Sequence, residues 1–321
     1  MHYDVFNGDA DGIIALLQLR LAQPKKATLV TGVKRDIQLL DKLSFRANDS
    51  LTVLDVSMEK NKAGLKSALN IGAEVFYADH HKSGDIPEHS RLDAHINLDA
   101  NTCTALIIDQ LLEGRFHYWA ITAAYGDNLV AKADQLADLA GLTAKQQEQL
   151  KDLGVLINYN GYGSKLQDLH FDPAELFTEL LAYDDPFAVI ADQNSPYPIL
   201  KAAYQRDMEQ ALSISPKYKS DTLGLFELPN EASSRRISGV YGNLLANRSP
   251  DTAHAVLTAN SDGTYTVSLR APLNNKQGAG DICSQFPSGG GRAAAAGINA
   301  LEKGQIEAFI QSVESYYRSE H

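Results

Sequence analysis

Seven of the acidic and imidazole side chains in the first 130 residues are placed where they could bind divalent metal ions together. They follow short apolar runs or a helical segment, and they are Asp9, Asp11, Asp55, Asp79, His80, His81 and Asp127. Carboxylates dominate this set and no thiolate belongs to it, which suits manganese or magnesium better than a structural zinc ion. The carboxylates are numerous enough for two ions about 3.5–4 Å apart, which would polarise a phosphoryl group and activate a water molecule. The set therefore predicts hydrolysis of a phosphoester.

Asp9 and Asp11 are two residues apart, and Gly12 follows them directly. In an extended segment both side chains would point the same way, and the two carboxylates would repel each other unless a cation lies between them. The alternative is an Asp-Gly turn that caps the following helix. Asp55 presents the same choice, because a carboxylate directly after a buried apolar run needs either a cation or a helix N-terminus as its partner.

Asp79, His80 and His81 form the most specific part of the set. Adjacent side chains leave the backbone on different sides, so one imidazole can bind a metal ion while the other faces a substrate. A pair of structural histidines is the alternative interpretation. Asp127 lies at the end of a helical segment, where a plain helix cap is the alternative to a metal ligand.

The elements that must position these residues follow from the apolar runs of the first hundred residues. Strands are predicted at residues 3–6, 27–31, 51–54 and 73–78. Helical stretches of 10–20 residues separate them, which indicates right-handed crossovers and a parallel sheet. The carboxyl ends of parallel strands share one edge, where ligands bind, so this edge would collect the acidic and imidazole side chains.

The rest of the chain predicts a helical extension and a second, smaller α/β domain. Helices are expected at 118–125, 131–140, 144–159 and 173–182, and a hinge is expected between 213–216 and a strand at 222–226. A helix at 233–246, a hairpin of 253–258 with 265–270, a glycine-rich turn at 288–291 and a helix at 303–317 follow. We therefore predict an α/β protein with domains 1–210 and 211–321 and an active site in the cleft between them.

Composition excludes several classes of protein. The 321 residues include 29 basic and 40 acidic side chains, a formal net charge of −11, which disfavours binding of long nucleic acid. The only cysteines, Cys103 and Cys283, cannot form a disulfide framework. No apolar run resembles a signal peptide or a membrane span, so we expect a cytoplasmic protein without a membrane partner. The sequence leaves open whether the chain forms a homodimer.

The order of these motifs resembles the DHH phosphoesterase family with its C-terminal DHH-associated domain. The motifs are 7–12 (NGDADG), Asp55, Asp79-His80-His81, Asp127 and the late glycine- and alanine-rich run 288–297. Within that family the length is most similar to the nanoRNase oligoribonucleases and to related dinucleotide and pAp hydrolases. The resemblance implies a manganese-dependent phosphodiesterase that converts very short RNA, above all dinucleotides such as pGpG, to nucleoside monophosphates.

The resemblance also implies roles for the metal-binding residues. Asp9 would hold one manganese ion. Asp11, His80 and Asp127 would hold the other, and Asp55 would bridge both ions. Many family members have a metal-binding histidine four residues before the first aspartate, where this chain has Val5, so water or Asn7 would complete the first site.

Further roles follow from the same resemblance. Asp79 would orient the His80 ring, and His81 would contact the scissile phosphate or assist the leaving group. In the second domain Arg270 resembles the family's phosphate-binding arginine. The backbone N–H groups of Gly289, Gly290 and Gly291 would approach an anion closely. Arg292 stands where the family often has histidine, which would change the contacts with the substrate end or its bases.

Other functions remain open at this point. A pAp phosphatase or a hydrolase of cyclic dinucleotides would use the same residues. A catalytically weak nucleotide sensor would follow if Val5 abolished one metal site. A processive exonuclease is disfavoured, because the sequence contains no basic stripe.

Overall fold

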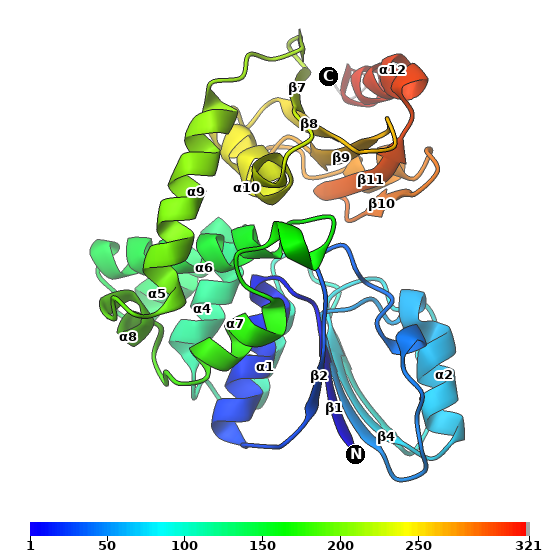
Figure 1. The fold of residues 1–321 in the computed structure, drawn as a ribbon, viewed down its shortest axis with the longest axis vertical. Helices are drawn as coiled ribbons and strands as arrows, with labels where there is room; N and C mark the ends of the chain where they lie inside the picture. Colours follow the sequence, from blue (N-terminus) through cyan, green and yellow to red (C-terminus); the bar gives the residue numbers. More distant parts are fainter. Residues whose placement is uncertain (319–321) are drawn as a thin grey trace. The chain divides into compact units, whose positions relative to one another are not determined.

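The computed structural model describes residues 1–318 and divides into two compact units, of which the second begins at Ala203. Each unit is built on its own β-sheet (Figure 1). The division lies within helix α9 (Pro196–Leu212), so the domain boundary predicted at 210/211 falls near the end of the same helix. No helix among the described residues is long and apolar enough to cross a membrane.

A five-stranded sheet forms the centre of the first unit, in the order β2-β1-β3-β4-β5. Its strands are β1 (His2–Phe6), β2 (Thr28–Val30), β3 (Ser50–Leu54), β4 (Glu74–Asp79) and β5 (Leu92–Ile96). All neighbours are parallel, and one row of partners crosses the sheet through Val30, Val5, Val53, Tyr77 and Ala94. The predicted parallel sheet is confirmed. Strand β5 was not predicted, because its sequence, LDAHI, lacks a continuous apolar run.

Helices of the first unit cover both faces of this sheet, with α1 and α2 on opposite sides (Figure 1). They are α1 (Ala10–Ala22), α2 (Lys62–Asn70), α3 (Thr104–Leu111), α4 (His117–Gly126), α5 (Val130–Leu139), α6 (Ala144–Gly161), α7 (Pro173–Leu180) and α8 (Pro186–Ala191). Short 3-10 helices lie at Leu40–Lys42, Glu59–Asn61 and Leu166–Asp168. Helix α1 buries residues around its whole circumference, including Ile13, Ile14 and Leu16, as expected of a helix between two layers.

Two glycines bring the helices α4 and α6 into close contact beside α1. A Cβ atom on Gly154 would clash with the carbonyl oxygen of Thr122 and lie 2.9 Å from the backbone nitrogen of Gly126. A Cβ atom on Gly126 would lie 2.5 Å from the Cβ of Ala10. Because the three backbones approach so closely, the ends of α4 and α6 lie near the start of α1, where Asp9 and Asp11 are placed.

The second unit has a six-stranded mixed sheet, in the order β10-β11-β9-β8-β7-β6. Its strands are β6 (Tyr218–Lys219), β7 (Leu223–Leu228), β8 (Ala253–Ala259), β9 (Tyr265–Arg270), β10 (Gly289–Gly291) and β11 (Ala295–Leu301). Its helices are α10 (Ala232–Arg248), α11 (Ala279–Cys283), the 3-10 turn Lys303–Gln305 and α12 (Ile306–Arg318). Helix α10 joins the parallel pair β7 and β8, and its Tyr241 ring contacts Phe226 with centroids 5.5 Å apart. The core with α11 and α12 includes Val267, Ile282 and Phe309.

The glycine-rich segment of the second unit differs from its prediction. Instead of a turn, Gly289–Gly291 forms the edge strand β10, antiparallel to β11. A Cβ atom on Gly289 would clash with the carbonyl oxygen of Cys283, and Gly291 has a φ of 145°. Gly289 is therefore needed for packing and Gly291 for the backbone conformation.

Replacing Gly154 by alanine tests the close approach of α4 and α6. The added methyl group meets backbone atoms, which cannot rotate away, so we expect the free energy of unfolding to fall by about 1–3 kcal/mol despite the higher helix propensity of alanine. Trp119 is the only tryptophan and is buried in α4, so its fluorescence during urea denaturation measures this change. Lys145→Ala, at an exposed position of the same helix as Gly154, is the matched control and should change stability by less than about 0.5 kcal/mol. A Gly154→Ala variant at least as stable as the wild type would contradict the packing described.

Candidate metal centre

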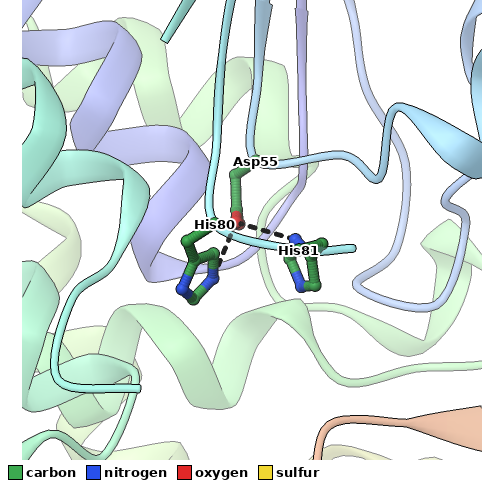
Figure 2. A group of neighbouring side chains, drawn as sticks. All are labelled: Asp55, His80 and His81. Carbon is green, nitrogen blue, oxygen red and sulfur yellow. Dashed lines mark ion pairs between the residues drawn. The ribbon is translucent and has the colours of Figure 1, made fainter. Parts of the chain in front are cut away.

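Predicted metal ligands that follow different strands meet at the carboxyl edge of the parallel sheet, namely Asp11, Asp55, His80 and His81. The backbone ladder continues beyond the strands, since the N–H of Asn7 donates to Leu54 O (3.2 Å) and the N–H of Asp55 donates to Ala78 O (3.1 Å). Asp55, His80 and His81 each offer a ligand atom, and these atoms lie within 4.8 Å of one another (Figure 2). This arrangement agrees with the expectation that the carboxyl ends of the parallel strands bring these side chains together.

His80 directs one ring nitrogen into this group. Its Nδ1 lies 2.9 Å from the carbonyl oxygen of Thr102, which can only accept a hydrogen bond, so Nδ1 carries a proton. In the neutral ring the lone pair is then on Nε2, which lies 3.4 Å from Asp55 Oδ1 and 3.6 Å from Asp11 Oδ2. The side chain is 3% exposed. A backbone carbonyl that fixes the tautomer is the usual second partner of a metal-binding histidine.

His81 is held differently, and here the predicted role of Asp79 is wrong. Asp79 Oδ1 accepts a hydrogen bond from His81 Nδ1 at 2.7 Å, and so orients the His81 ring rather than that of His80. The reason is the alternation of an extended chain, which places residues 79 and 81 on one side and residue 80 on the other. The His81 side chain is 31% exposed, in contrast to His80. It is therefore the more accessible of the two rings.

Asp9 and Asp11 do not point the same way, because α1 begins at Ala10 and the segment is not extended. Asp9 Oδ1 accepts the N–H of Gly12 at 3.1 Å, so the alternative of a helix cap is correct for Asp9. Asp11 caps another helix. Its two oxygens accept the N–H groups of Thr104 and Ala105 at the start of α3, both at 2.7 Å.

Asp55 lies at the electrostatic centre of the cluster. It has a left-handed backbone with a φ of 58°, and its Oδ1 accepts a hydrogen bond from Thr104 Oγ1 at 3.2 Å. Burial raises its pKa well above the usual range. The negative charges of four other aspartates raise it further: Asp11, Asp9, Asp79 and Asp127. A divalent cation would reverse this effect by stabilising the ionised form.

Two buried acceptors near Asp55 also fit a bound cation. Asn7 Oδ1 and Asp79 Oδ2 have no hydrogen-bond partner within residues 1–318, although both side chains are buried. Buried polar atoms are normally paired, so such atoms call for an explanation. Oxygen atoms with one or two imidazole nitrogens are the donors that manganese and magnesium accept, and the residues present therefore fit such an ion.

Lys34 is a residue of this centre that sequence reasoning missed. Its Nζ forms an ion pair with Asp9 Oδ2, donates to Asn158 Oδ1 at 3.1 Å and lies 5.3 Å from the centroid of the Tyr162 ring. Burial alone would raise the pKa of Asp9, but the ammonium group outweighs it and lowers that pKa. A signal was available, because Lys34 follows β2 and so belongs to the same edge of the sheet as the other residues.

Cys103 places a sulfur atom beside these carboxylates, since it directly precedes α3. The residue is fully buried, and burial, the charges of Asp11 and Asp127 and a hydrogen bond with Asp11 raise the pKa of its thiol well above the usual value. The raised pKa favours the protonated thiol over the thiolate that would bind a metal ion.

The remaining predicted residues, apart from Asp127, lie in the second unit. Asp127 directly follows α4, and its charge acts on Asp9 as well as on Asp55. Arg270 is 9% exposed and donates to two groups of α10, Asn243 Oδ1 at 2.5 Å and Gly239 O at 3.2 Å. Arg292 is half-buried, and its N–H donates to Ala295 O at 2.9 Å in the connection from β10 to β11.

Substituting Asp55 by asparagine tests the electrostatics of the cluster. Because the folded pKa of Asp55 is raised, ionisation of Asp55 destabilises the fold as pH rises from about 4 through the folded pKa. In EDTA at pH 7, Asp55→Asn should therefore raise Tm, by roughly 2–4 °C for each kcal/mol gained, and this gain should shrink toward pH 4. Asparagine also tolerates the left-handed backbone.

Asp85→Asn is the matched control, because Asp85 is exposed and lies outside the cluster. Its Tm should follow that of the wild type across the same pH range in thermal scans. A lower Tm for Asp55→Asn than for the wild type at pH 7 in EDTA would show that the carboxylate is stabilising, contrary to this account.

A protein-family model matches most of the second unit. Residues 223–319 match the DHHA1 domain model. Comparison with curated protein sequences finds no match.

Solved structures are similar to the chain over its whole length. An exonuclease RecJ bound to manganese has a TM-score of 0.59 and 16% identity, over 99% of this chain and 90% of that one. RecJ from Thermus thermophilus, in complex with manganese, has a TM-score of 0.59 and 18% identity, over 99% of this chain and 52% of that one. A pGpG-specific phosphodiesterase, PggH from Vibrio cholerae, has a TM-score of 0.56 and 15% identity, over 100% of both chains.

These comparisons agree with the structure in both units. At identities below 20% the structural similarity establishes the fold, a parallel-sheet unit followed by a smaller mixed α/β unit. The Asp79-His80-His81 triplet lies at the carboxyl edge of the first sheet, and the DHHA1 match covers the second unit. The chain therefore has the fold of these RecJ and PggH structures, and residues 223–319 of its second unit match the DHHA1 domain.

Proposed function

We propose that this chain is a metal-dependent phosphodiesterase that hydrolyses very short RNA to nucleoside monophosphates. The observation that carries the proposal is the convergence of His80 Nε2 with the carboxylates of Asp11 and Asp55 in a buried site. Buried carboxylates so placed repel one another unless a cation is bound. The similarity of the fold to RecJ structures bound to manganese supports manganese as the ion.

Asp11, Asp55 and His80 would hold the ion, with Asn7 Oδ1 as a further buried oxygen donor. When bound, such an ion lowers the pKa of a water molecule and draws electrons from a phosphoryl group. His80 is prepared for this role by its hydrogen bond to Thr102 O, which places the lone pair of the neutral ring on Nε2. Asp11 is prepared by its bonds to the α3 backbone, which hold both of its oxygens in place.

His81 is the side chain that we assign to the substrate. Asp79 accepts a hydrogen bond from His81 Nδ1 and so holds the ring in place, as a buried carboxylate does beside other catalytic histidines. In the reaction, a water molecule would attack the phosphorus atom and release one of its protons to solvent, while the bond to the leaving ribose oxygen breaks. His81 donates its Nε2 proton to that oxygen, which leaves as a hydroxyl group.

The proposed substrates are dinucleotides, pGpG among them. The chain and the pGpG-specific phosphodiesterase of Vibrio cholerae cover each other completely, which supports a substrate of similar size. The formal net charge of −11 disfavours long polymers. Arg270, Arg292 and the glycines 289–291 of the second unit are proposed to bind the substrate phosphate, and the bonds from Arg270 to α10 hold its guanidinium group in a fixed orientation.

A panel of substrates tests the activity. With manganese, the purified protein should convert pGpG to GMP faster than it hydrolyses pAp or cyclic dinucleotides, as measured by chromatography of the products. His80→Ala should lower kcat/KM at least about 100-fold, because it removes a ligand rather than a supporting group. His89→Ala, an exposed histidine outside the site, should leave the rate unchanged. Absence of turnover on every di- to pentanucleotide, with manganese bound, would reject the proposal in favour of a nucleotide sensor.

The role of Arg270 can be separated from that of the metal ligands. Arg270→Lys keeps the charge but loses the forked geometry, so KM for pGpG should rise about 10–100-fold, as for one charge-assisted hydrogen bond. The kcat value should change little, and the circular dichroism spectrum should show that the second unit is folded. A fall in kcat with an unchanged KM would instead place Arg270 in the chemical step.

A further inference from the structure

The ammonium group of Lys34 lies within the acidic cluster and contacts three side chains there. Its ammonium group is paired with Asp9, bonded to Asn158 Oδ1 at 3.1 Å and placed against the Tyr162 ring, and the side chain is 22% exposed. The three partners come from the start of α1 and from the last turn and end of α6. A surface lysine that pairs by chance is not enclosed by two distant segments in this way.

The backbone around Lys34 is fixed against the same segments. Its N–H donates to Gly161 O at 2.8 Å, and its carbonyl accepts a hydrogen bond from Asn7 Nδ2 at 3.3 Å. A Cβ atom on Gly8 would clash with Gly32 O, and a Cβ atom on Gly161 would lie 3.1 Å from the Cα of Asp9. Glycines at these positions allow the loop after β2 to approach the motif, so the backbone of Lys34 is held within reach of Asp9.

The aspartates of the cluster thus divide into two groups. Asp9 has Lys34 as a permanent cation, and the same ammonium also interacts electrostatically with Asp127. Asp11 and Asp55 instead face His80, whose Nε2 lies 3.6 Å from Asp11 Oδ2 and 3.4 Å from Asp55 Oδ1. The protein itself balances the charge of Asp9 with an ammonium group, whereas the charges of Asp11 and Asp55 require a cation from outside the protein.

The position four residues before Asp9 offers no ligand that could compete with the lysine. Val5 is fully buried and belongs to the apolar core of the first unit. The pair of ions expected from the carboxylates alone would place a divalent ion against an ammonium group, and the two positive charges would repel each other.

We propose that the Lys34 ammonium group takes the place of one divalent ion, so that the site binds a single ion at Asp11, Asp55 and His80. Lys34 then supplies the second positive charge that a two-metal site would direct at a phosphate. This inference rests on the metal dependence in the proposed function, and it replaces the expectation of two ions with one.

Counting the ions tests this inference without an activity assay. Manganese is titrated into the metal-free protein in a calorimeter, and bound manganese is confirmed by electron paramagnetic resonance. The wild type should bind one ion. Lys34→Met, which keeps the length of the side chain without its charge, should bind two, and Lys34→Arg should return to one. Lys201→Met is the matched control, because Lys201 also pairs with an aspartate and lies 5.1 Å from a tyrosine ring, and it should bind one.

The outcomes separate this inference from the proposed function. Two ions in the wild type, or one ion in Lys34→Met, would overturn the role of Lys34 and leave the phosphodiesterase proposal standing. No ion in the wild type would overturn both. If Lys34→Met does not fold, Asp9→Asn decides the matter. It should retain the single ion with its affinity changed less than about threefold, whereas His80→Ala should weaken it at least about tenfold. A loss of the ion in Asp9→Asn would place the ion at Asp9 and contradict the inference.

Discussion

Repulsion between buried carboxylates is the constraint on which the site depends. Burial raises the pKa of Asp55, and four other aspartates add to this effect. The structure relieves the repulsion by three means. Helix N-termini bind Asp9 and Asp11 through backbone N–H groups, the ammonium of Lys34 binds Asp9, and imidazole rings bind Asp55 and Asp79. The repulsion that remains lies around Asp55, and a divalent cation bound there would remove it.

The parallel sheet explains why residues so distant in sequence share one site, and it is also the part of the fold that the sequence predicts best. The runs before Asp9, Asp55 and Asp79 are apolar because these strands are buried on both faces. Strand β5, with a polar and partly exposed sequence, has no such signature. Helix α3 lies within the predicted helical extension, but its bounds were missed for a different reason. It is held in place by Asp11, more than ninety residues away, and no local pattern records such a contact.

The sequence predicted which residues form the candidate site better than it predicted their contacts. Residue type and position after a strand were enough to select Asp55, His80 and His81. The position of Lys34 after β2 was a signal that it belongs to the same edge of the sheet. The partner of Asp79 and the ion pair of Lys34 with Asp9 were not predictable, because they depend on the side of the backbone from which a side chain projects and on how closely a loop can approach. That approach is allowed by Gly8 and Gly161, and a glycine in a sequence does not reveal what lies against it.

Cys103 gives the site a chemical property of its own. Burial and the charges of Asp11 and Asp127 raise the pKa of its thiol and so favour the neutral form, which reacts more slowly with peroxide and with alkylating agents than a thiolate does. A sulfur atom therefore fills space next to the ligands without adding thiolate character to the centre. The burial and the negative charge that make this edge suitable for a hard ion thus also make the neighbouring sulfur a weak nucleophile.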